Sequence, residues 1–150
     1  MAEAPVIEVT FPALLRAART TYGAAMRAAL EQAGFGDIPK NGIFVIGALN
    51  RTGAPLADII RMLRVSKQSA GQLVDALVER GYLDRTTDED DRRRVTVSLS
   101  KRGRKAAEIS RAANDRVTAA LLDKVGPDCV AQTRKGLAAL IELGWERKSE

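Results

Sequence analysis

The sequence contains no histidine and only one cysteine. The single thiol of Cys129 cannot form an internal disulfide, and the lack of imidazole removes the usual zinc ligands and the base of a catalytic triad. Aromatic residues, at 4%, are too few for the stacking platforms on which proteins bind single-stranded nucleic acids. We therefore expect no enzyme, no metal and no cofactor. The residues alone leave open whether Cys129 is inert or senses oxidants.

Long apolar runs are also missing, and no stretch approaches the roughly 20 residues needed to cross a bilayer. The N-terminal segment MAEAPVIEVTF lacks the basic and apolar regions of an export signal. We therefore expect a soluble, cytoplasmic protein without membrane contact. A chain of 150 residues with 45% hydrophobic and 29% charged residues suits a single globular domain over 1–150.

Positive charge is concentrated in the middle of the chain. Residues 51–105 contain 13 Lys and Arg against 8 Asp and Glu, whereas the remainder contains 11 of each. The whole formal net charge of +5 therefore belongs to this segment. A localised basic surface is expected of a protein that binds phosphates, and the shortage of aromatic residues favours duplex DNA.

Both ends of the chain show the pattern of long helices. Apolar residues from Phe11 to Ala29 recur at steps of three and four, which predicts a helix that Thr10 caps and Gly34 ends. Two further helices are expected within 100–146. The regular spacing and small side chains of the first stripe favour close packing against another helix.

The segment between Pro55 and Gly81 predicts a helix-turn-helix. Pro55 suits the first turn of one short helix, and Ser66 is a suitable N-cap for a second helix, which Gly81 ends. A short buried helix over 41–49 precedes the pair. Two short helices joined by a tight turn form the helix-turn-helix unit.

A β-hairpin is predicted directly after these helices. Residues 82–85 have extended character, and apolar and polar residues alternate strictly from Val95 to Ser100. The tip between these strands, at residues 88–94, reads DEDDRRR. A helix-turn-helix followed by such a hairpin is a winged helix.

Two interpretations of the charged tip are open. It is either a solvated turn whose charges pair with each other, or a device that enters the minor groove of DNA. Arginine suits the minor groove because its planar head is weakly hydrated. On the second interpretation Arg93 enters the groove, Asp91 pairs with its guanidinium and fixes its direction, and Arg92 and Arg94 reach phosphates.

The residues of this region resemble a known family. The spacing of Asp91, Arg93, Val97, Leu99, Ser100 and Gly103 resembles the D-x-R-x-x-x-[LV]-x-L-[TS]-x-x-G wing signature of the MarR family of bacterial winged-helix transcription regulators. The preceding VSKQSAGQLVDALVERGYLDR is similar to that family's recognition helix and first wing strand. Small departures occur: valine at 97 where leucine is commoner, and serine for threonine at 100.

The resemblance implies a mainly α fold with a small β wing. A winged helix-turn-helix DNA-binding lobe at 39–99 would join a helical dimerisation region built from both chain ends, at 10–34 and 100–146. It also implies a homodimer whose first and last helices interlock. Two recognition helices would then read an inverted-repeat operator in double-stranded DNA.

The recognition helix should present polar side chains to DNA. Gln68 and Gln72 can address adenine edges, Lys67 suits guanine or phosphate, and Ser69 would support them by capping or by phosphate contact. Gly71 is a departure that costs roughly 0.5–1 kcal/mol relative to alanine, but it would let the helix backbone approach DNA closely. The expected DNA-binding residues are Ser66, Lys67, Gln68, Ser69, Gly71, Gln72, Asp91, Arg92, Arg93 and Arg94, with Arg51, Arg61 and Arg64 as weaker phosphate candidates.

Many members of the resembled family bind small, often anionic aromatic effectors between the dimer helices and the DNA-binding lobe. The resemblance therefore implies a ligand-responsive repressor, and Tyr22, Met26 and Phe44 are candidates to line its effector site or, alternatively, plain core. The other function left open is a winged-helix module that binds an acidic protein. Steep salt dependence and preference for one operator would distinguish a DNA binder from such a module.

Overall fold

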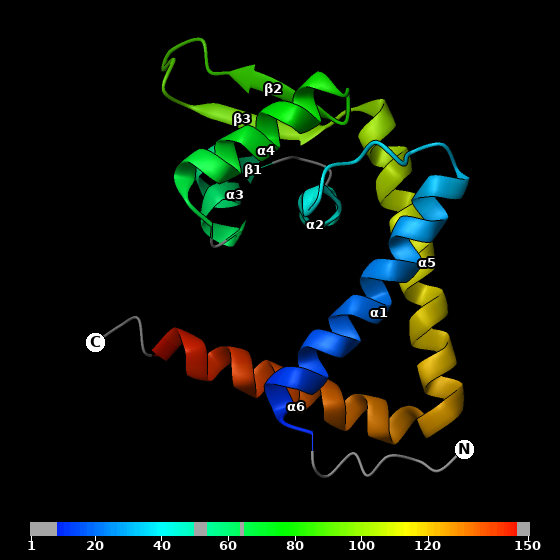
Figure 1. The fold of residues 1–150 in the computed structure, drawn as a ribbon. Coiled ribbons are helices and arrows are strands. Elements are labelled where there is room, and N and C mark those ends of the chain that lie inside the picture. The colour runs from blue at the N-terminus through cyan, green and yellow to red at the C-terminus, as the bar shows by residue number, and fades with distance from the viewer. Residues whose placement is uncertain (1–8, 50–53, 64, 147–150) are drawn as a thin grey trace. The chain divides into compact units, whose positions relative to one another are not determined.

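The structure, a computed structural model, describes residues 9–49, 54–63 and 65–146. Within these ranges the chain forms six helices and three strands, so that the fold is mainly helical with a small three-stranded antiparallel wing (Figure 1). The chain makes two compact units that divide within its fifth helix, after Asn114. None of the described helices is long and apolar enough to cross a membrane.

The first unit begins with α1, Phe11–Gln32, and the short α2, Gly42–Ala48. Gly34 follows α1 with a φ of +85°, a conformation that glycine adopts without steric cost, and so ends the helix as the sequence predicted. Thr10 occupies the N-cap position of α1, but its side chain makes no capping hydrogen bond. The sequence therefore predicted the position of the N-cap correctly, but the Thr10 side chain does not stabilise the helix end by a hydrogen bond.

The predicted helix-turn-helix is present as α3, Leu56–Leu63, and α4, Lys67–Glu79. The hydroxyl oxygen of Ser66 accepts a hydrogen bond from the N–H of Ser69 at 3.1 Å, which confirms Ser66 as the N-cap of α4. Gly81 ends the same helix with a φ of +77°. Pro55, expected in the first turn of α3, instead lies in a strand.

That strand is β1, Ala54–Pro55, which sequence reasoning missed. It pairs with one edge of β3, Val95–Leu99, and β2, Leu83–Thr87, pairs with the other, so the strand order is β1-β3-β2. Proline is tolerated here because an edge strand does not require every N–H. A two-residue strand has no periodicity, so the sequence gives no sign of it.

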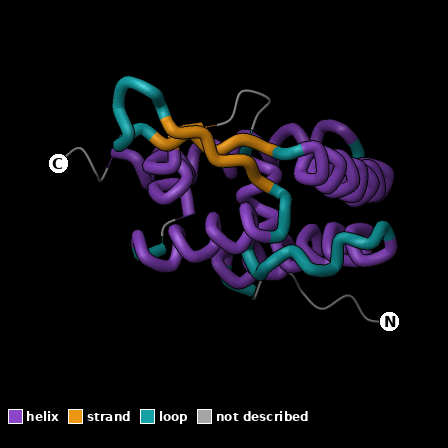
Figure 2. Tube along the Cα trace, turned by 90° about the horizontal axis from the view of Figure 1, so that it is seen from above, coloured by secondary structure: helices purple, strands orange, loops and turns teal. Residues whose placement is uncertain are grey.

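The wing is the ribbon of β2 and β3 with the loop between them. Leu83 lies opposite Leu99, and Thr87 lies opposite Val95, so the loop of residues 88–94 closes the ribbon at its outer end (Figure 2). The predicted alternation is confirmed because Val97 and Leu99 are buried.

The core of the first unit joins α2, α3, α4 and the wing to the end of α1 and the start of α5, Lys101–Val125. Gly103 allows α5 to approach the base of the wing, because a Cβ there would lie 2.0 Å from the carbonyl oxygen of Tyr82. Ser100 caps this helix by accepting from the N–H of Gly103 at 3.0 Å. The fully buried side chains of this core include Tyr82, Leu30, Ile46, Leu77, Leu83, Val45, Val74 and Val97.

The second unit contains the end of α5 and α6, Pro127–Glu146. Gly126 separates the two helices with a φ of +82°. Most of α6 is exposed, including large apolar side chains at Leu140, Ile141 and Leu143. Exposed apolar groups of this size on one helix are suited to contact with another chain.

Candidate nucleic-acid interface

Helix α4 buries one face and exposes the other. Ala70, Val74 and Leu77 are buried in the core, whereas the predicted contact residues Lys67, Gln68, Ser69 and Gln72 are exposed and Gly71 is half-buried. The hydroxyls of Ser66 and Ser69 also bond to each other at 2.9 Å. The two serines thus stabilise the start of α4, and the glutamines have free access to solvent.

An ion pair ties the exposed side of α4 to the wing. The guanidinium of Arg85, on β2, lies 2.5 Å from the carboxylate of Asp75, on α4. Sequence reasoning did not find this pair, since ten residues and a change from helix to strand separate its members. An exposed pair adds only about 0–1 kcal/mol to stability, but it offsets a negative charge that would repel phosphates.

Aspartate side chains build the turn at the wing tip. Asp88 Oδ1 accepts from the N–H groups of Asp90 at 2.9 Å and Asp91 at 3.4 Å, and Asp91 Oδ1 accepts from the N–H of Arg93 at 3.0 Å. The main chain closes the loop, because the N–H of Asp88 donates to the carbonyl of Arg94 at 3.0 Å. The acidic half of the charge block therefore holds the backbone that carries the basic half.

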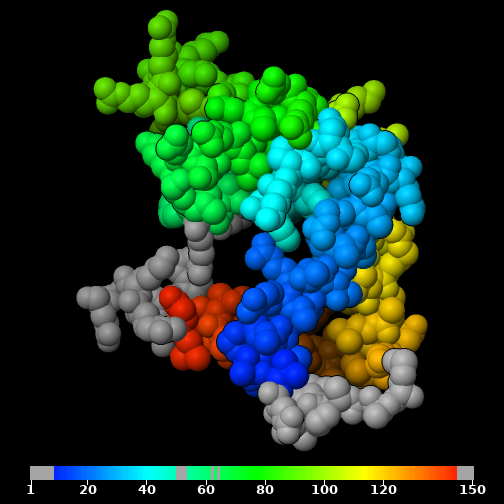
Figure 3. Space-filling view, viewed as in Figure 1, coloured from blue at the N-terminus to red at the C-terminus, as the bar shows by residue number. Residues whose placement is uncertain are grey.

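The geometry corrects the expected role of Asp91. Among the described residues no ion pair joins its carboxylate to the guanidinium of Arg93, and the carboxylate binds the main-chain N–H of Arg93 instead. The reason is local: in a tight turn an aspartate reaches the N–H two residues ahead more easily than the end of a long side chain. Arg92, Arg93 and Arg94 are exposed, and the wing tip stands clear of the lobe in Figure 3.

One hollow brings together cations from the two predicted DNA-binding elements. It has a volume of about 520 Å³ and lies between the start of α3, the start of α4 and the wing. Lys67 of α4 lines it together with Arg93 and Arg94 of the wing tip. Its other lining residues are Pro55, Leu56, Ala57, Ile60, Asp88, Val95 and Thr96.

The structure adds little support for phosphate contacts by the weaker candidates. Arg61 is exposed and forms an ion pair with Asp58, one turn earlier on α3. Arg51 and Arg64 lie outside the described residues.

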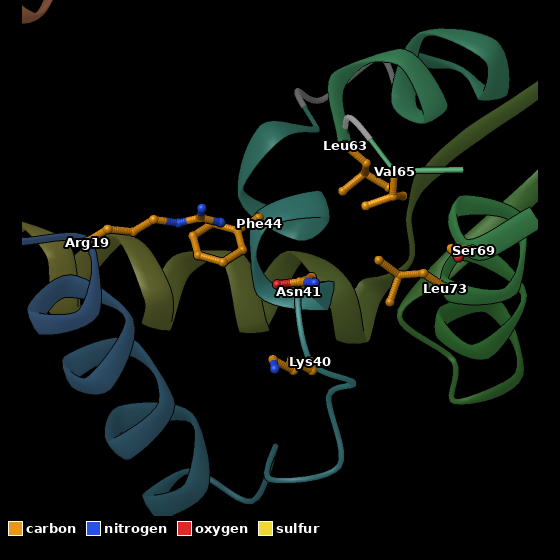
Figure 4. Close-up of a pocket in the computed structure, with 8 residues that line it drawn as sticks. All are labelled: Arg19, Lys40, Asn41, Phe44, Leu63, Val65, Ser69 and Leu73. Atoms are coloured by element: carbon orange, nitrogen blue, oxygen red, sulfur yellow. The ribbon is translucent and has the colours of Figure 1, made fainter. Parts of the chain in front are cut away.

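A second large hollow, of about 550 Å³, lies between α1, α2 and the helix-turn-helix (Figure 4). Arg19 and Lys40 supply positive charge to it, and the Arg19 guanidinium lies 4.3 Å from the centroid of the Phe44 ring, a cation–π contact. The remaining lining residues are Asn41, Leu63, Val65, Ser69 and Leu73. Sequence reasoning named Phe44 but missed both cations.

The three effector candidates are not brought together at one hollow. Phe44 lines the hollow of Figure 4 and also a neighbouring one of about 450 Å³ between α1 and α2. Met26 lines only that neighbouring hollow. Tyr22 is half-buried on α1 and lines neither.

A polar cluster fastens the base of the wing. The Tyr82 hydroxyl donates to Asp37 Oδ1, and the guanidinium of Arg102 lies 3.0 Å from the same oxygen and 3.1 Å from the hydroxyl. The hydrogen bond from Tyr82, with the nearby charge of Arg102, lowers the pKa of Asp37. Burial, with the hydrogen bond to Asp37, raises the pKa of Tyr82. The cluster links the loop before α2 to the residue that precedes β2 and to the start of α5.

Comparison with known proteins agrees with this architecture. Residues 41–94, which span α2 to the wing tip, match the model of the MarR family. No curated protein matches the sequence.

Solved structures match nearly the whole chain. The crystal structure of MarR has a TM-score of 0.79 at 16% identity, covering 100% of this chain and 99% of that one. A MepR–DNA complex from S. aureus has a TM-score of 0.72 at 22% identity, covering 90% of this chain and 98% of that one. A probable transcriptional regulator from Pseudomonas aeruginosa has a TM-score of 0.69 at 27% identity, covering 89% and 98%.

Proposed function

We propose that this chain, a member of the MarR family of winged helix-turn-helix DNA-binding transcription regulators, is a homodimeric, ligand-responsive repressor. Its binding site would be an inverted-repeat operator. The observation that carries the proposal is the hollow where Lys67 of α4 meets Arg93 and Arg94 of the wing. Cations from two separate elements converge there without a carboxylate ion pair to any of the three among the described residues. Such a surface is suited to phosphates.

Base recognition is assigned to α4. Gln68 and Gln72 are one turn apart and exposed, so both can face the floor of a major groove. A glutamine can bond bidentately to the edge of adenine, and each good contact contributes about 1–3 kcal/mol of discrimination. Lys67 adds a contact to guanine or phosphate.

Minor-groove contact is assigned to Arg93. The turn built by Asp88 and Asp91 holds the backbone of Arg93 while its side chain stays exposed. A rigid backbone lowers the conformational entropy lost on binding. Arg92 and Arg94 are placed on phosphates to either side. MepR, which this chain resembles in fold, has been solved in complex with DNA, and this likeness supports DNA binding in general.

Dimerisation is assigned to the helices at 10–34 and 100–146. Phe11 at the start of α1 is 74% exposed and Ile141 on α6 is 61% exposed, which leaves large apolar groups in water in the single chain. Burying them against a second copy would be favourable, since apolar surface contributes about 25 cal/mol per Å² removed from water.

The effector site is assigned to the hollow of Figure 4. Its cations Arg19 and Lys40 face apolar side chains such as Leu63 and Leu73, a combination that suits a small aromatic carboxylate. Phe44 belongs to this site, and Met26 lines the neighbouring hollow between α1 and α2. We expect aromatic carboxylates to release the protein from operator DNA, and we expect Arg19→Ala to lose this response.

Because the protein would act on DNA, we also expect it in the cytoplasm.

Selection of bound fragments from the source genome tests the proposal. We expect one inverted-repeat sequence to be enriched, and its affinity to exceed that of random duplex by 10³-fold or more and to fall steeply with salt, as is typical of specific DNA binding. Equal affinity for all duplexes, or none, would instead favour the module that binds an acidic protein.

A further inference from the structure

Gly71, in the first half of α4, has no reason within the chain to be glycine. A Cβ built at this position meets nothing within 4 Å, so packing does not exclude a side chain. Gly71 is also not among the residues with positive φ, so the backbone does not require glycine. Glycine inside a helix is less stable than alanine. The chain therefore keeps an unfavourable residue that its own fold does not explain.

The place of Gly71 on α4 suggests an external reason. Lys67 lies one turn before it and Asp75 one turn after it, so the three residues share one flank of the helix. Both neighbours are directed toward the wing: Lys67 lines the hollow shared with Arg93 and Arg94, and Asp75 pairs with Arg85 of β2. Gly71 thus marks a side-chain-free position on the flank of α4 that faces the wing.

A strand of DNA has to pass this flank if the proposed function is right. When α4 lies in a major groove and the wing in the adjacent minor groove, the sugar-phosphate backbone that separates the two grooves runs between helix and wing. Lys67, Arg93 and Arg94 supply cations for its phosphates. The carboxylate of Asp75, which would repel them, is already engaged by Arg85.

We infer that Gly71 is a positioning residue for DNA, whose missing side chain lets one sugar-phosphate backbone lie directly against α4. The inference rests on the proposed function and extends it. The close approach brings the backbone within reach of Lys67, Arg93 and Arg94 together. A methyl group at this position would hold the strand away from all three cations. Because the contact is to the backbone, Gly71 affects affinity for any duplex and not the choice of sequence.

The test compares Gly71→Ala and Gly71→Leu with Gly47→Ala in the full-length protein. Gly47, on α2, is the matched control because a Cβ there also meets nothing within 4 Å. Both alanine variants should raise the melting temperature by about 2–4 °C, since alanine favours helix. Binding to operator and to random duplex is then measured by fluorescence anisotropy over a series of salt concentrations.

We expect Gly71→Ala to weaken binding to operator and to random duplex alike by about tenfold, and Gly71→Leu to weaken both further. The salt slope of both variants should become shallower by about one or more, because each weakened phosphate contact lowers it by up to about 0.9. Gly47→Ala should bind as the parent does. Gly71→Ala with parental affinity, or with loss on the operator alone, would overturn the inference while leaving the proposed function intact. Failure of the parent protein to bind any duplex would overturn the proposed function, and this inference with it.

Discussion

At the scale of single residues, Asp91 stabilises the wing tip through the main chain. Its side-chain oxygen accepts from the N–H of Arg93 at 3.0 Å, and its carbonyl oxygen accepts from the N–H of Arg94 at 2.8 Å. The position of the aspartate in the wing signature was evident from the sequence. The hydrogen-bond partner of its carboxylate was not evident, because both the guanidinium and the main-chain N–H of Arg93 are donors. Only three-dimensional geometry selects between them.

This geometry predicts different results for two substitutions of Asp91. Asp91→Asn keeps an oxygen that can accept from the Arg93 N–H, so its operator affinity should stay within about threefold of the parent, whereas Asp91→Ala should lose about tenfold, a cost of roughly 1.4 kcal/mol. Fluorescence anisotropy with a labelled operator measures both. Equal losses in the two variants would show that the charge of Asp91 matters, as an ion pair with Arg93 requires.

Asp37 gives a residue-scale prediction for acid stability. The hydrogen bond from Tyr82 lowers its pKa below 3.8 in the folded state. A depressed pKa means that the carboxylate stabilises the fold above about pH 4 and that this contribution is lost as pH falls through the folded value. Asp37→Asn should therefore weaken the acid dependence of stability, and Tyr82→Phe should destabilise by about 1 kcal/mol through the lost hydrogen bond.

Urea unfolding between pH 3 and pH 7 measures both effects. Asp84→Asn, which removes an exposed carboxylate from β2, serves as the control and should leave the pH profile as it is in the parent. An unchanged profile in Asp37→Asn as well would contradict the role given to the cluster.

At the scale of elements, the sequence predicted the helices and strands that show a hydrophobic periodicity or a capping residue. Alternation placed β3, and Ser66 with Gly81 placed the ends of α4, because these signals act over a few neighbouring residues. Contacts between distant segments were missed: β1 is too short for a pattern, the ion pair of Arg85 and Asp75 crosses from strand to helix, and the cations of the Figure 4 hollow come from α1 and the loop before α2.

The N-cap of the recognition helix offers a prediction at this scale. Ser66→Ala removes the acceptor for the Ser69 N–H and should lower the free energy of unfolding by about 1 kcal/mol. Ser66→Asn should stay close to the parent because asparagine also caps well. Thermal unfolding measures the change, and equal stability of all three proteins would show that the cap does not hold α4.

At the scale of the whole molecule, charge and apolar surface are segregated along the chain. The excess of positive charge lies in residues 51–105, whereas large exposed apolar side chains occur at Phe11 and along α6. The sequence predicted this division from composition and helical stripes. This division agrees with the proposed function, in which the basic region contacts DNA and the chain ends contact a second copy.

The proposed dimer is tested at Ile141, which is 61% exposed on α6. Light scattering should give the parent a mass twice the 16.2 kDa of one chain. Ile141→Asp should shift the mass toward one chain, because a buried unpaired charge is costly, and should weaken operator binding as well. Gln132→Glu, an exposed polar change on the same helix, should remain dimeric. A parent protein of 16.2 kDa in solution would rule out the dimer.

The most direct test of the winged-helix account is the salt dependence of operator binding by Arg93→Ala. The control is Arg111→Ala, which removes the same charge from the exposed surface of α5. Arg93→Ala should bind the operator at least about tenfold more weakly and with a salt slope smaller by about two, one for each subunit of the dimer, whereas Arg111→Ala should match the parent. Parental affinity and slope in Arg93→Ala would contradict the winged-helix account, because the wing would then make no contact with DNA.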